Sequence, residues 1–185
     1  EGRFFNPDTV ATSDVSGKLN GQKYRVLDGG QSAHVFCIAK QASGERGVAL
    51  FASSTEGVSI ESRRMMDIHS TGSIRLDGVP AADIVWLTGD DVEGGIQQTI
   101  DQATIVLAAE MMGSAREVLE RTVAYLGERE QFDVKLGTFQ ALQHRCAHMY
   151  CELELAESAV LAALTALDHA APNVSLLASS AKALA

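Results

Sequence analysis

The feature that most restricts the fold of this chain is the proline-free stretch between Pro80 and Pro172, in which apolar residues recur at helical spacing. Steps of three and four residues separate them, and such heptad-like stripes favour shallow left-handed crossing in a helix bundle. The sequence therefore predicts one helix reaching about Gly127 and a second from about Gly137 to Asp168. The stripes consist of Ile105, Ala108, Met112, Ala115, Leu119, Val123 and Leu126, then of Phe139, Leu142, Cys146, Met149, Leu153, Ala156, Val160, Ala163 and Leu167.

Residues 1 to about 80 have the period of strands, and Pro80 is expected to end that regime. Asn20–Gly21 accepts the positive φ angles of a type I′ turn, so Val15–Leu19 and Gln22–Leu27 are expected to form a hairpin. The fold class is therefore predicted as α+β, a small antiparallel β barrel or sandwich followed by long antiparallel helices of a helical bundle. Further strand-like runs are His34–Ala39, Val48–Ala52, Gly57–Glu61 and Ser73–Asp77.

The change of period predicts a β domain over residues 1–88 and a helical-bundle domain over residues 89–185. The loop Gly89–Gly95 is expected to lead into the first helix, and Pro172 to stand in the first turn of a third helix, still in progress at Ala185. Two helices and a fragment cannot cover the seam of a bundle, so we expect more helices from missing parts of the polypeptide or from other subunits. Both domains are expected to be incomplete, the first at its N-terminus and the second at its C-terminus. The helical domain is expected to form a homo- or hetero-oligomer, a dimer or tetramer.

Composition excludes several classes of protein. The net charge is -9, from 24 acidic and 15 basic residues, which argues against nonspecific nucleic-acid binding. No apolar run reaches the roughly 18 residues that span a bilayer. The N-terminus has neither a start methionine nor a signal-peptide pattern. Three widely spaced cysteines make a disulfide framework improbable, so a cytoplasmic location is expected.

The segment Glu128–Phe132, followed closely by Phe139–Gln140, joins the two predicted helices. Arginine supplies a planar fork of donors for phosphate, each glutamine offers a donor and an acceptor, and phenylalanine offers a ring face. These residue types suit a flat, anionic ligand that forms hydrogen bonds, and they indicate a nucleotide-cofactor contact. An ordinary capped corner between helices remains the alternative interpretation.

The chain also carries short motifs in a fixed order. Together they resemble the middle β domain and the first part of the C-terminal helical domain of acyl-CoA dehydrogenases, over essentially the whole chain. The motifs are Leu19–Lys23, similar to the family's "LNGxK" hairpin; Asp77–Ala81, similar to its "V-x-VP" exit from the β domain; and Ala109–Gly113, Tyr125–Phe132 and Phe139–Gln140, similar to its "A…G…Y…R-x-QF…FQ" signature. Within the family, Thr9–Thr12 and Phe139–Arg145 resemble the small subunits of pimeloyl-CoA dehydrogenase-like enzymes.

The resemblance implies FAD as cofactor, lying extended between the two domains and touched by the helical corner of a neighbouring subunit. Arg129 would pair with the pyrophosphate, and Gln131, Phe132 and Gln140 would hold the adenosine end. The implied reaction removes the α proton of an acyl-CoA thioester by a carboxylate and transfers the β hydride to the flavin. An electron-transfer flavoprotein is the implied oxidant, and lipid metabolism the implied context.

Departures from the family pattern concern the flavin ring and the substrate. Arg25–Leu27 stands where the family has Trp-x-Thr, and Leu27 cannot donate the hydrogen bond of a threonine hydroxyl. Asp101 and Tyr125 are expected to contact the acyl-CoA, but Thr104 replaces the arginine of the family's Asp-x-x-Arg. Ala103 occupies the position where some relatives carry the catalytic glutamate. We therefore predict no catalytic residue within this chain.

Two other functions compete with a complete dehydrogenase. In the first alternative the chain is a noncatalytic subunit of a heteromeric acyl-CoA dehydrogenase and contributes the nucleotide-facing part of a partner's FAD site. In the second it is a helical interaction module without cofactor. His144, His148 and Cys151 share one face of the second helix, but no fourth ligand is evident, so no metal site is predicted.

Overall fold

The computed structural model describes residues 11–13, 16–66 and 69–185 of the chain. The polypeptide forms two compact units, residues 1–95 and 96–185, each with its own hydrophobic core. The first unit contains β1 (Ala11–Ser13), β2 (Leu19–Leu27), η2 (Gly29–Gln31), β3 (His34–Lys40), β4 (Arg46–Ala52), β5 (Val58–Arg64), β6 (Ser70–Val79), η3 (Ala81–Asp83), β7 (Val85–Leu87) and the start of α1 (Asp90–Glu128). The second contains the rest of α1, β8 (Glu130–Gln131), β9 (Val134–Lys135), η4 (Leu136–Thr138), α2 (Gln140–Asp168) and α3 (Val174–Leu184).

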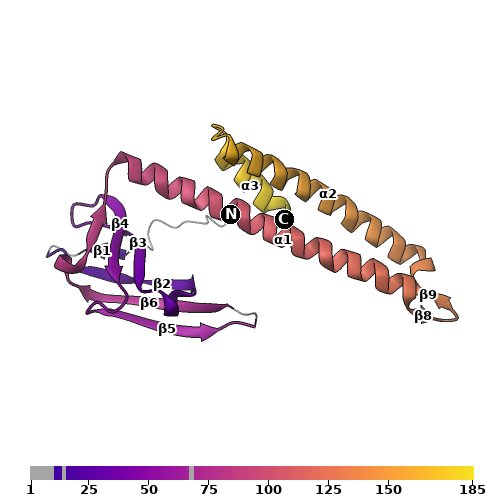
Figure 1. The fold of residues 1–185 in the computed structure, drawn as a ribbon, viewed down its shortest axis with the longest axis horizontal. Coiled ribbons are helices and arrows are strands. Elements are labelled where there is room, and N and C mark those ends of the chain that lie inside the picture. Colours follow the sequence, from indigo (N-terminus) through magenta and orange to yellow (C-terminus); the bar gives the residue numbers. More distant parts are fainter. Residues whose placement is uncertain (1–10, 14–15, 67–68) are drawn as a thin grey trace. The chain divides into compact units, whose positions relative to one another are not determined.

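The strands of the first unit form one seven-stranded sheet in the order β5-β6-β2-β1-β3-β4-β7 (Figure 1). Neighbouring strands are antiparallel except β1 and β3, which pair in parallel. Alternate residues from both halves of the sheet enter one core, so the sheet folds over itself like a sandwich. In the described part of the chain the two end strands, β5 and β7, do not pair with each other, so the sheet does not close into a barrel. The predicted α+β fold class is confirmed, and of the two predicted forms of the β domain, barrel or sandwich, the structure shows a sandwich-like one. The largest fully buried side chains of this core are Leu19, Ile74, Val79 and Cys37.

The predicted hairpin turn at Asn20–Gly21 is wrong. Both residues lie inside β2, and the chain reverses before Leu19, which pairs with Ser13 of β1. A Cβ atom at Gly21, whose φ is 150°, would lie 2.8 Å from Cα of Ala11. The glycine is therefore needed for the close approach of β1, and the register of β2 against β6 shifts here as in a β-bulge.

Pro80 does not end the strands as predicted. The short strand β7 (Val85–Leu87) follows it and pairs with β4. Three residues are too few to display a period of two, so the sequence pattern did not reveal this strand.

The expected loop Gly89–Gly95 is helical from Asp90 onward. Glycine is a poor helix former, so this start of α1 needs support from outside the helix. Arg46 of β4 provides it, because its Nε donates to Oε2 of Glu93 at 2.9 Å. The acidic Glu93 also lies near the positive end of the helix dipole.

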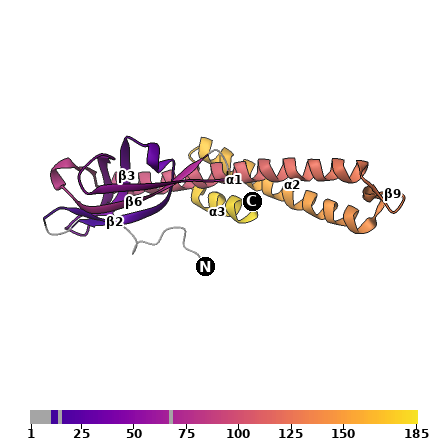
Figure 2. The ribbon, with the colours of Figure 1, turned by 90° about the horizontal axis from the view of Figure 1, so that it is seen from below.

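In the second unit, α1 and α2 run antiparallel and α3 packs beside them (Figures 1 and 2). One core joins the three helices, and none of the helices in the described part of the chain has the length and apolar character that a bilayer crossing needs. The buried residues of this core are Ile105, Ala108, Val160, Ala163, Ala178 and Ala181.

The predicted seam between the long helices is buried only in the half near α3. Leu153 and Ala156 continue the core, but toward the corner Met149 and Val123 are exposed. Two apolar depressions, of about 340 and 400 Å³, flank the helix pair there, with Leu119 and Leu153 lining both. Three helices therefore leave part of the seam uncovered.

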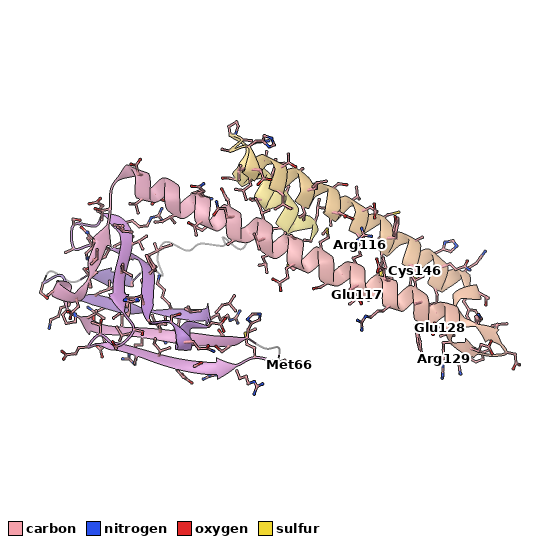
Figure 3. All side chains as sticks on the ribbon, in the orientation of Figure 1. Met66, Arg116, Glu117, Glu128, Arg129 and Cys146 are labelled. Carbon is pink, nitrogen blue, oxygen red and sulfur yellow. The ribbon has the colours of Figure 1, made fainter. Side chains whose placement is uncertain are left out.

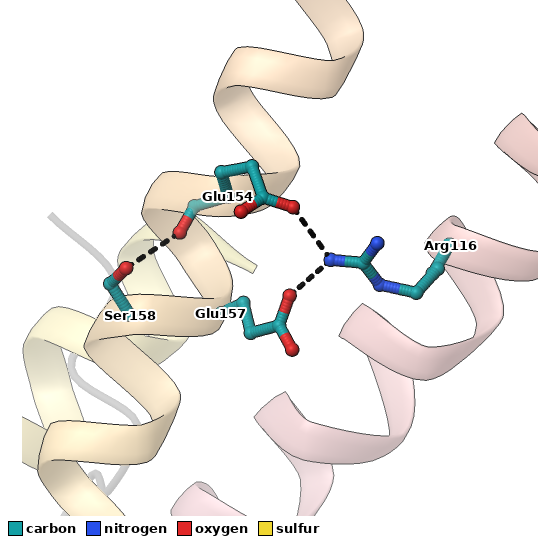
Figure 4. A network of polar contacts seen from close by, with 4 residues as sticks. All are labelled: Arg116, Glu154, Glu157 and Ser158. Carbon is teal, nitrogen blue, oxygen red and sulfur yellow. Dashed lines mark hydrogen bonds and ion pairs between the residues drawn. The ribbon is translucent and has the colours of Figure 1, made fainter.

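An ion-pair network crosses from α1 to α2 beside the buried Leu153 and Ala156 (Figure 4). Nη2 of Arg116 lies 2.9 Å from Oε1 of Glu154 and also pairs with Glu157. The Ser158 hydroxyl donates to the backbone carbonyl of Glu154 at 2.8 Å. One arginine thus holds two carboxylates of the opposite helix.

The connection from α2 to α3 ends α2 in a left-handed residue. Ala170 has a φ of 47°, and the Ala171 N–H donates to the Ala166 carbonyl at 2.9 Å, as in a Schellman motif. Pro172 lies in this turn, two residues before α3, rather than in the first turn of that helix.

Candidate functional site

The corner between α1 and α2 contains a small β-hairpin that the sequence did not predict. β8 and β9 pair through Gln131 and Val134, so Phe132 and Asp133 form a two-residue turn. Their φ angles are 57° and 61°, the left-handed values of a type I′ turn. Aspartate tolerates this conformation but phenylalanine does not favour it, so the surrounding structure must hold Phe132 in the turn.

Arg129 lies between the end of α1 and this hairpin (Figure 3). Its backbone is fixed on both sides, because its N–H donates to the Tyr125 carbonyl and its carbonyl accepts from the Leu136 N–H, each at 2.9 Å. Its side chain is exposed, and among the described residues the guanidinium has no hydrogen-bond or ion-pair partner. A backbone fixed on both sides thus presents a cation that no described group neutralises.

The two predicted aromatic residues meet at this corner. The rings of Phe132 and Phe139 pack edge to face with centroids 6.3 Å apart. Phe132 is 84% exposed, so the contact covers little of its ring. A large apolar surface in this position is available to a ligand or to another chain.

The start of α2 adds backbone donors that the sequence analysis overlooked. Phe139 is the N-cap, and its side chain makes no capping hydrogen bond. Among the described residues, the N–H groups of Gln140 and Ala141 therefore have no partner at the positive end of the helix dipole, whereas the Leu142 N–H donates to the Phe139 carbonyl at 3.0 Å. Gln131 donates only to the neighbouring Glu130 carbonyl, at 2.9 Å. The missing capping residue before Gln140 is the sequence signal that could have identified these donors.

The structure thus brings Arg129, Gln131, Phe132 and Gln140 to one short segment of the chain. The segment offers a guanidinium and two backbone amides without partners among the described residues, together with two carboxamides and an exposed ring. Such groups can bind the phosphates and the base of a nucleotide. The donor set fits the FAD that the family resemblance implies.

The predicted substrate residues lie elsewhere on α1. Asp101 is only 8% exposed, and its carboxylate accepts hydrogen bonds from Gln97 at 2.9 Å and from the Ser175 hydroxyl of α3. It therefore connects two helices of the second unit. Tyr125 lies one turn before Arg129 and is exposed. The role of both residues toward acyl-CoA stays a prediction.

The residues that depart from the family pattern are also accessible. Leu27, at the end of β2, is 67% exposed and offers only a hydrocarbon surface. Ala103 is exposed and Thr104 half-buried on α1. Leu27 therefore offers no hydroxyl donor at the position where the family resemblance leads us to expect one.

The cluster of His144, His148 and Cys151 shows no metal-binding geometry. Over the described ranges, no group of three or more histidine, cysteine or acidic side chains is arranged to hold a metal ion. Nδ1 of His148 instead lies 3.5 Å from Oε2 of Glu152, one turn along the same helix.

Comparison with known proteins identifies the family. Residues 94–185 match the family model described as acyl-CoA dehydrogenase, C-terminal domain. The chain is 44% identical over 102 residues to acyl-CoA dehydrogenase FadE34 of Mycobacterium tuberculosis, covering 55% of this chain and 13% of the relative. It is 30% identical over 166 residues to the probable acyl-CoA dehydrogenase YngJ of Bacillus subtilis, covering 83% of this chain and 43% of the relative.

A solved structure agrees with these relatives. The Tcur3481-Tcur3483 steroid ACAD G363A variant superposes with a TM-score of 0.78 at 32% identity, over 96% of this chain and 47% of that one.

The fold and the corner thus define a β domain joined to part of a helical bundle. This chain belongs to the acyl-CoA dehydrogenase family. It spans less than half the length of each of the three proteins it was compared with. Of the motifs that resemble pimeloyl-CoA dehydrogenase-like small subunits, Thr9 and Val10 lie outside the described residues.

Proposed function

We propose that this chain is part of an FAD-dependent acyl-CoA dehydrogenase that catalyses α,β-dehydrogenation of an acyl-CoA thioester. The observation that carries the proposal is the corner after α1, where Arg129 has no ion-pair partner among the described residues. This corner lies within the segment 94–185 that matches the family's C-terminal domain. Charge without a partner, in an exposed position, suits an anionic cofactor better than it suits stability of the bundle.

The described residues divide the binding of FAD between them. Arg129 and the first amides of α2 would hold the pyrophosphate, and Gln131, Phe132 and Gln140 the adenosine end. Bound FAD supplies the oxidation, in which the acyl chain loses an α proton to a carboxylate and a β hydride to the flavin. The corner of one protomer reaches the cofactor of another, so an oligomer is part of the proposal.

The remaining assignments follow from the same family. Acyl-CoA is the substrate, with Asp101 and Tyr125 as contacts, and an electron-transfer flavoprotein is the oxidant. The Asp101 carboxylate already accepts from Gln97 and Ser175, so it would bind substrate through its remaining lone pairs. The cytoplasm is the proposed compartment, in keeping with cysteines that are unpaired.

Substitution of the free arginine tests the cofactor role. Arg129→Ala should weaken FAD binding by about tenfold or more, because a charge-assisted pair with the pyrophosphate is lost. The measurement is the flavin-to-protein absorbance ratio of the purified assembly, with FAD titration. Arg121→Ala is the matched control, since Arg121 is an exposed arginine on the same helix that pairs with Glu117. Equal flavin content in the two variants would contradict the proposal.

A second function is favoured by three residues of this chain. Leu27, Ala103 and Thr104 replace residues that would serve the flavin ring, the base and the CoA. In this second proposal the chain is a noncatalytic subunit, and its partner supplies the base and the contacts to the flavin ring. The complex would then hold one flavin for each pair of unlike chains, whereas a catalytic chain would form a homo-oligomer with one flavin for each chain. A cofactor-free interaction module predicts no rise in melting temperature on addition of FAD.

A further inference from the structure

The outer face of β2, β6 and β5 carries an open recess of about 650 Å³. The pairing places Arg63 opposite Thr71 and Glu61 opposite Ser73, and β2 lies on the other side of β6. Alternate residues of each strand share a face, so these side chains lie on the side away from the core. The recess is lined by Gln22, Tyr24, Arg25, Glu61, Arg63, Thr71, Gly72 and Ser73.

Arg25 has an unusual backbone in this recess. Its φ is 55°, a left-handed value that is rare for a residue with a Cβ. The register of β2 against β6 shifts between Lys23 and Val26, so Arg25 stands in a bulge. Bulges re-aim side chains, and backbone strain of this kind persists only where the surrounding structure enforces it.

The charges of the recess are not balanced. Arg63 donates through Nε and Nη2 to Oε1 of Glu61, at 3.1 and 2.8 Å. Arg25 has no hydrogen-bond or ion-pair partner among the described residues. The recess therefore holds an excess cation in a chain whose net charge is -9.

The other lining groups are mostly hydrogen-bond donors. The Tyr24 hydroxyl donates to Oε1 of Gln22 at 2.8 Å, which leaves the Gln22 amide NH₂ free to donate. The Thr71 hydroxyl oxygen is buried and has no partner among the described residues. Two guanidinium groups, an amide and hydroxyls together fit an oxyanion better than a neutral ligand.

We propose that this recess is a binding site for a phosphate-bearing ligand, with Arg25 as its principal anchor and Arg63 as its second cation. The site lies on the β unit, apart in sequence from the corner at Arg129. Arg25 stands in the segment that the family resemblance places beside the flavin ring, so an FAD or CoA occupant would rest on the proposed function, whereas a free phosphate would not. Its ligand chemistry is a phosphate or diphosphate group, which free phosphates, CoA and FAD all carry.

The test is titration of the purified full-length protein with inorganic pyrophosphate at fixed ionic strength, by calorimetry. Arg25→Gly removes the guanidinium and suits the positive φ, so the fold should be kept, as circular dichroism would verify. We expect saturable binding in the unsubstituted protein and about tenfold or greater weakening in Arg25→Gly. Arg121→Gln is the matched control, because Arg121 is an exposed arginine of α1 that pairs with Glu117 and does not line the recess, and it should change the Kd by less than about twofold.

The corner also offers an arginine, so each titration is repeated in an Arg129→Ala background. The site is supported if the Arg25-dependent binding persists there. It is overturned if the unsubstituted protein shows no saturable binding, or if Arg25→Gly and Arg121→Gln weaken binding equally.

Competition then identifies the source of the phosphate. CoA or FAD occupies the recess if saturating pyrophosphate and Arg25→Gly each weaken its binding. If neither molecule responds while pyrophosphate binding still requires Arg25, the ligand is a free phosphate anion. Retention of FAD in Arg25→Gly together with its loss in Arg129→Ala would separate this site from the corner.

Discussion

The contact between Asp101 and Ser175 allows a quantitative test of how α1 and α3 are held together. Ser175→Ala removes the hydroxyl that donates to a carboxylate only 8% exposed. A hydrogen bond to a charged group contributes about 1.5–3 kcal/mol, and because Ser175 itself is exposed we take the lower end, about 1.5 kcal/mol. For a chain of this size that corresponds to a fall in Tm of roughly 3–6 °C.

The assay is thermal unfolding followed by circular dichroism at 222 nm. Ser179→Ala is the matched control, because the exposed Ser179 hydroxyl donates only to a backbone carbonyl of its own helix, at 3.0 Å. We expect this control to shift Tm by about 1 °C or less. Asp101→Asn combined with Ser175→Ala should be less than additive, since both remove one interaction. Equal Tm values for Ser175→Ala and Ser179→Ala would refute the reasoning.

Three further predictions concern other parts of the chain. Ala170→Gly should stabilise the second unit by about 0.5–1 kcal/mol in denaturant unfolding, because Ala170 is held at a φ of 47° where glycine has no Cβ penalty; a loss of stability would contradict this. Hydrogen bonds from the Ser70 N–H and hydroxyl, with His69 nearby, hold the pKa of Asp28 below its ordinary value of 3.8. A group whose pKa is lowered in the folded state contributes stability above its unfolded-state pKa, and this stability is lost as the pH falls through the folded-state pKa. The Tm deficit of Asp28→Asn seen at pH 6 should therefore shrink below about pH 3.8. Burial raises the pKa of the Cys37 thiol, so in the native protein Cys37 should react with a thiol reagent at least about tenfold more slowly than the exposed Cys151 in the same sample, a difference that urea should abolish.

The helical period was enough to predict α1 and α2, because their stripes extend over many turns. Turns were harder. Asn20–Gly21 has the composition of a hairpin turn, yet Gly21 allows the backbone of Ala11 to approach closely. A glycine in the sequence is compatible with either a turn or a close approach, so the residue alone did not distinguish them. The opposite error occurred at Phe132–Asp133, which adopt type I′ angles without the residues that normally favour them.

The site was predictable in its residue types but not in its surroundings. Arg129 and Phe132 could be singled out by chemistry alone. The engagement of Asp101 could not, since its partner Ser175 lies 74 positions away and reaches it only after α3 has packed. The recess at Arg25 was also invisible, because strand register and a bulge place its lining residues together.

The uneven burial along the α1–α2 pair has a consequence for assembly. Arg116 joins the two helices beside the buried Leu153, and from there toward the hairpin that carries Arg129 the apolar residues Val123 and Met149 are exposed. Such an end opens locally at low cost, so its amide protons should exchange fastest of the two helices. Any chain that docks along the apolar stripes would rigidify the hairpin before a ligand arrives. The conformational entropy lost on docking would then not be lost a second time when the ligand binds. Subunit association and nucleotide capture would then reinforce each other through the same few turns of helix.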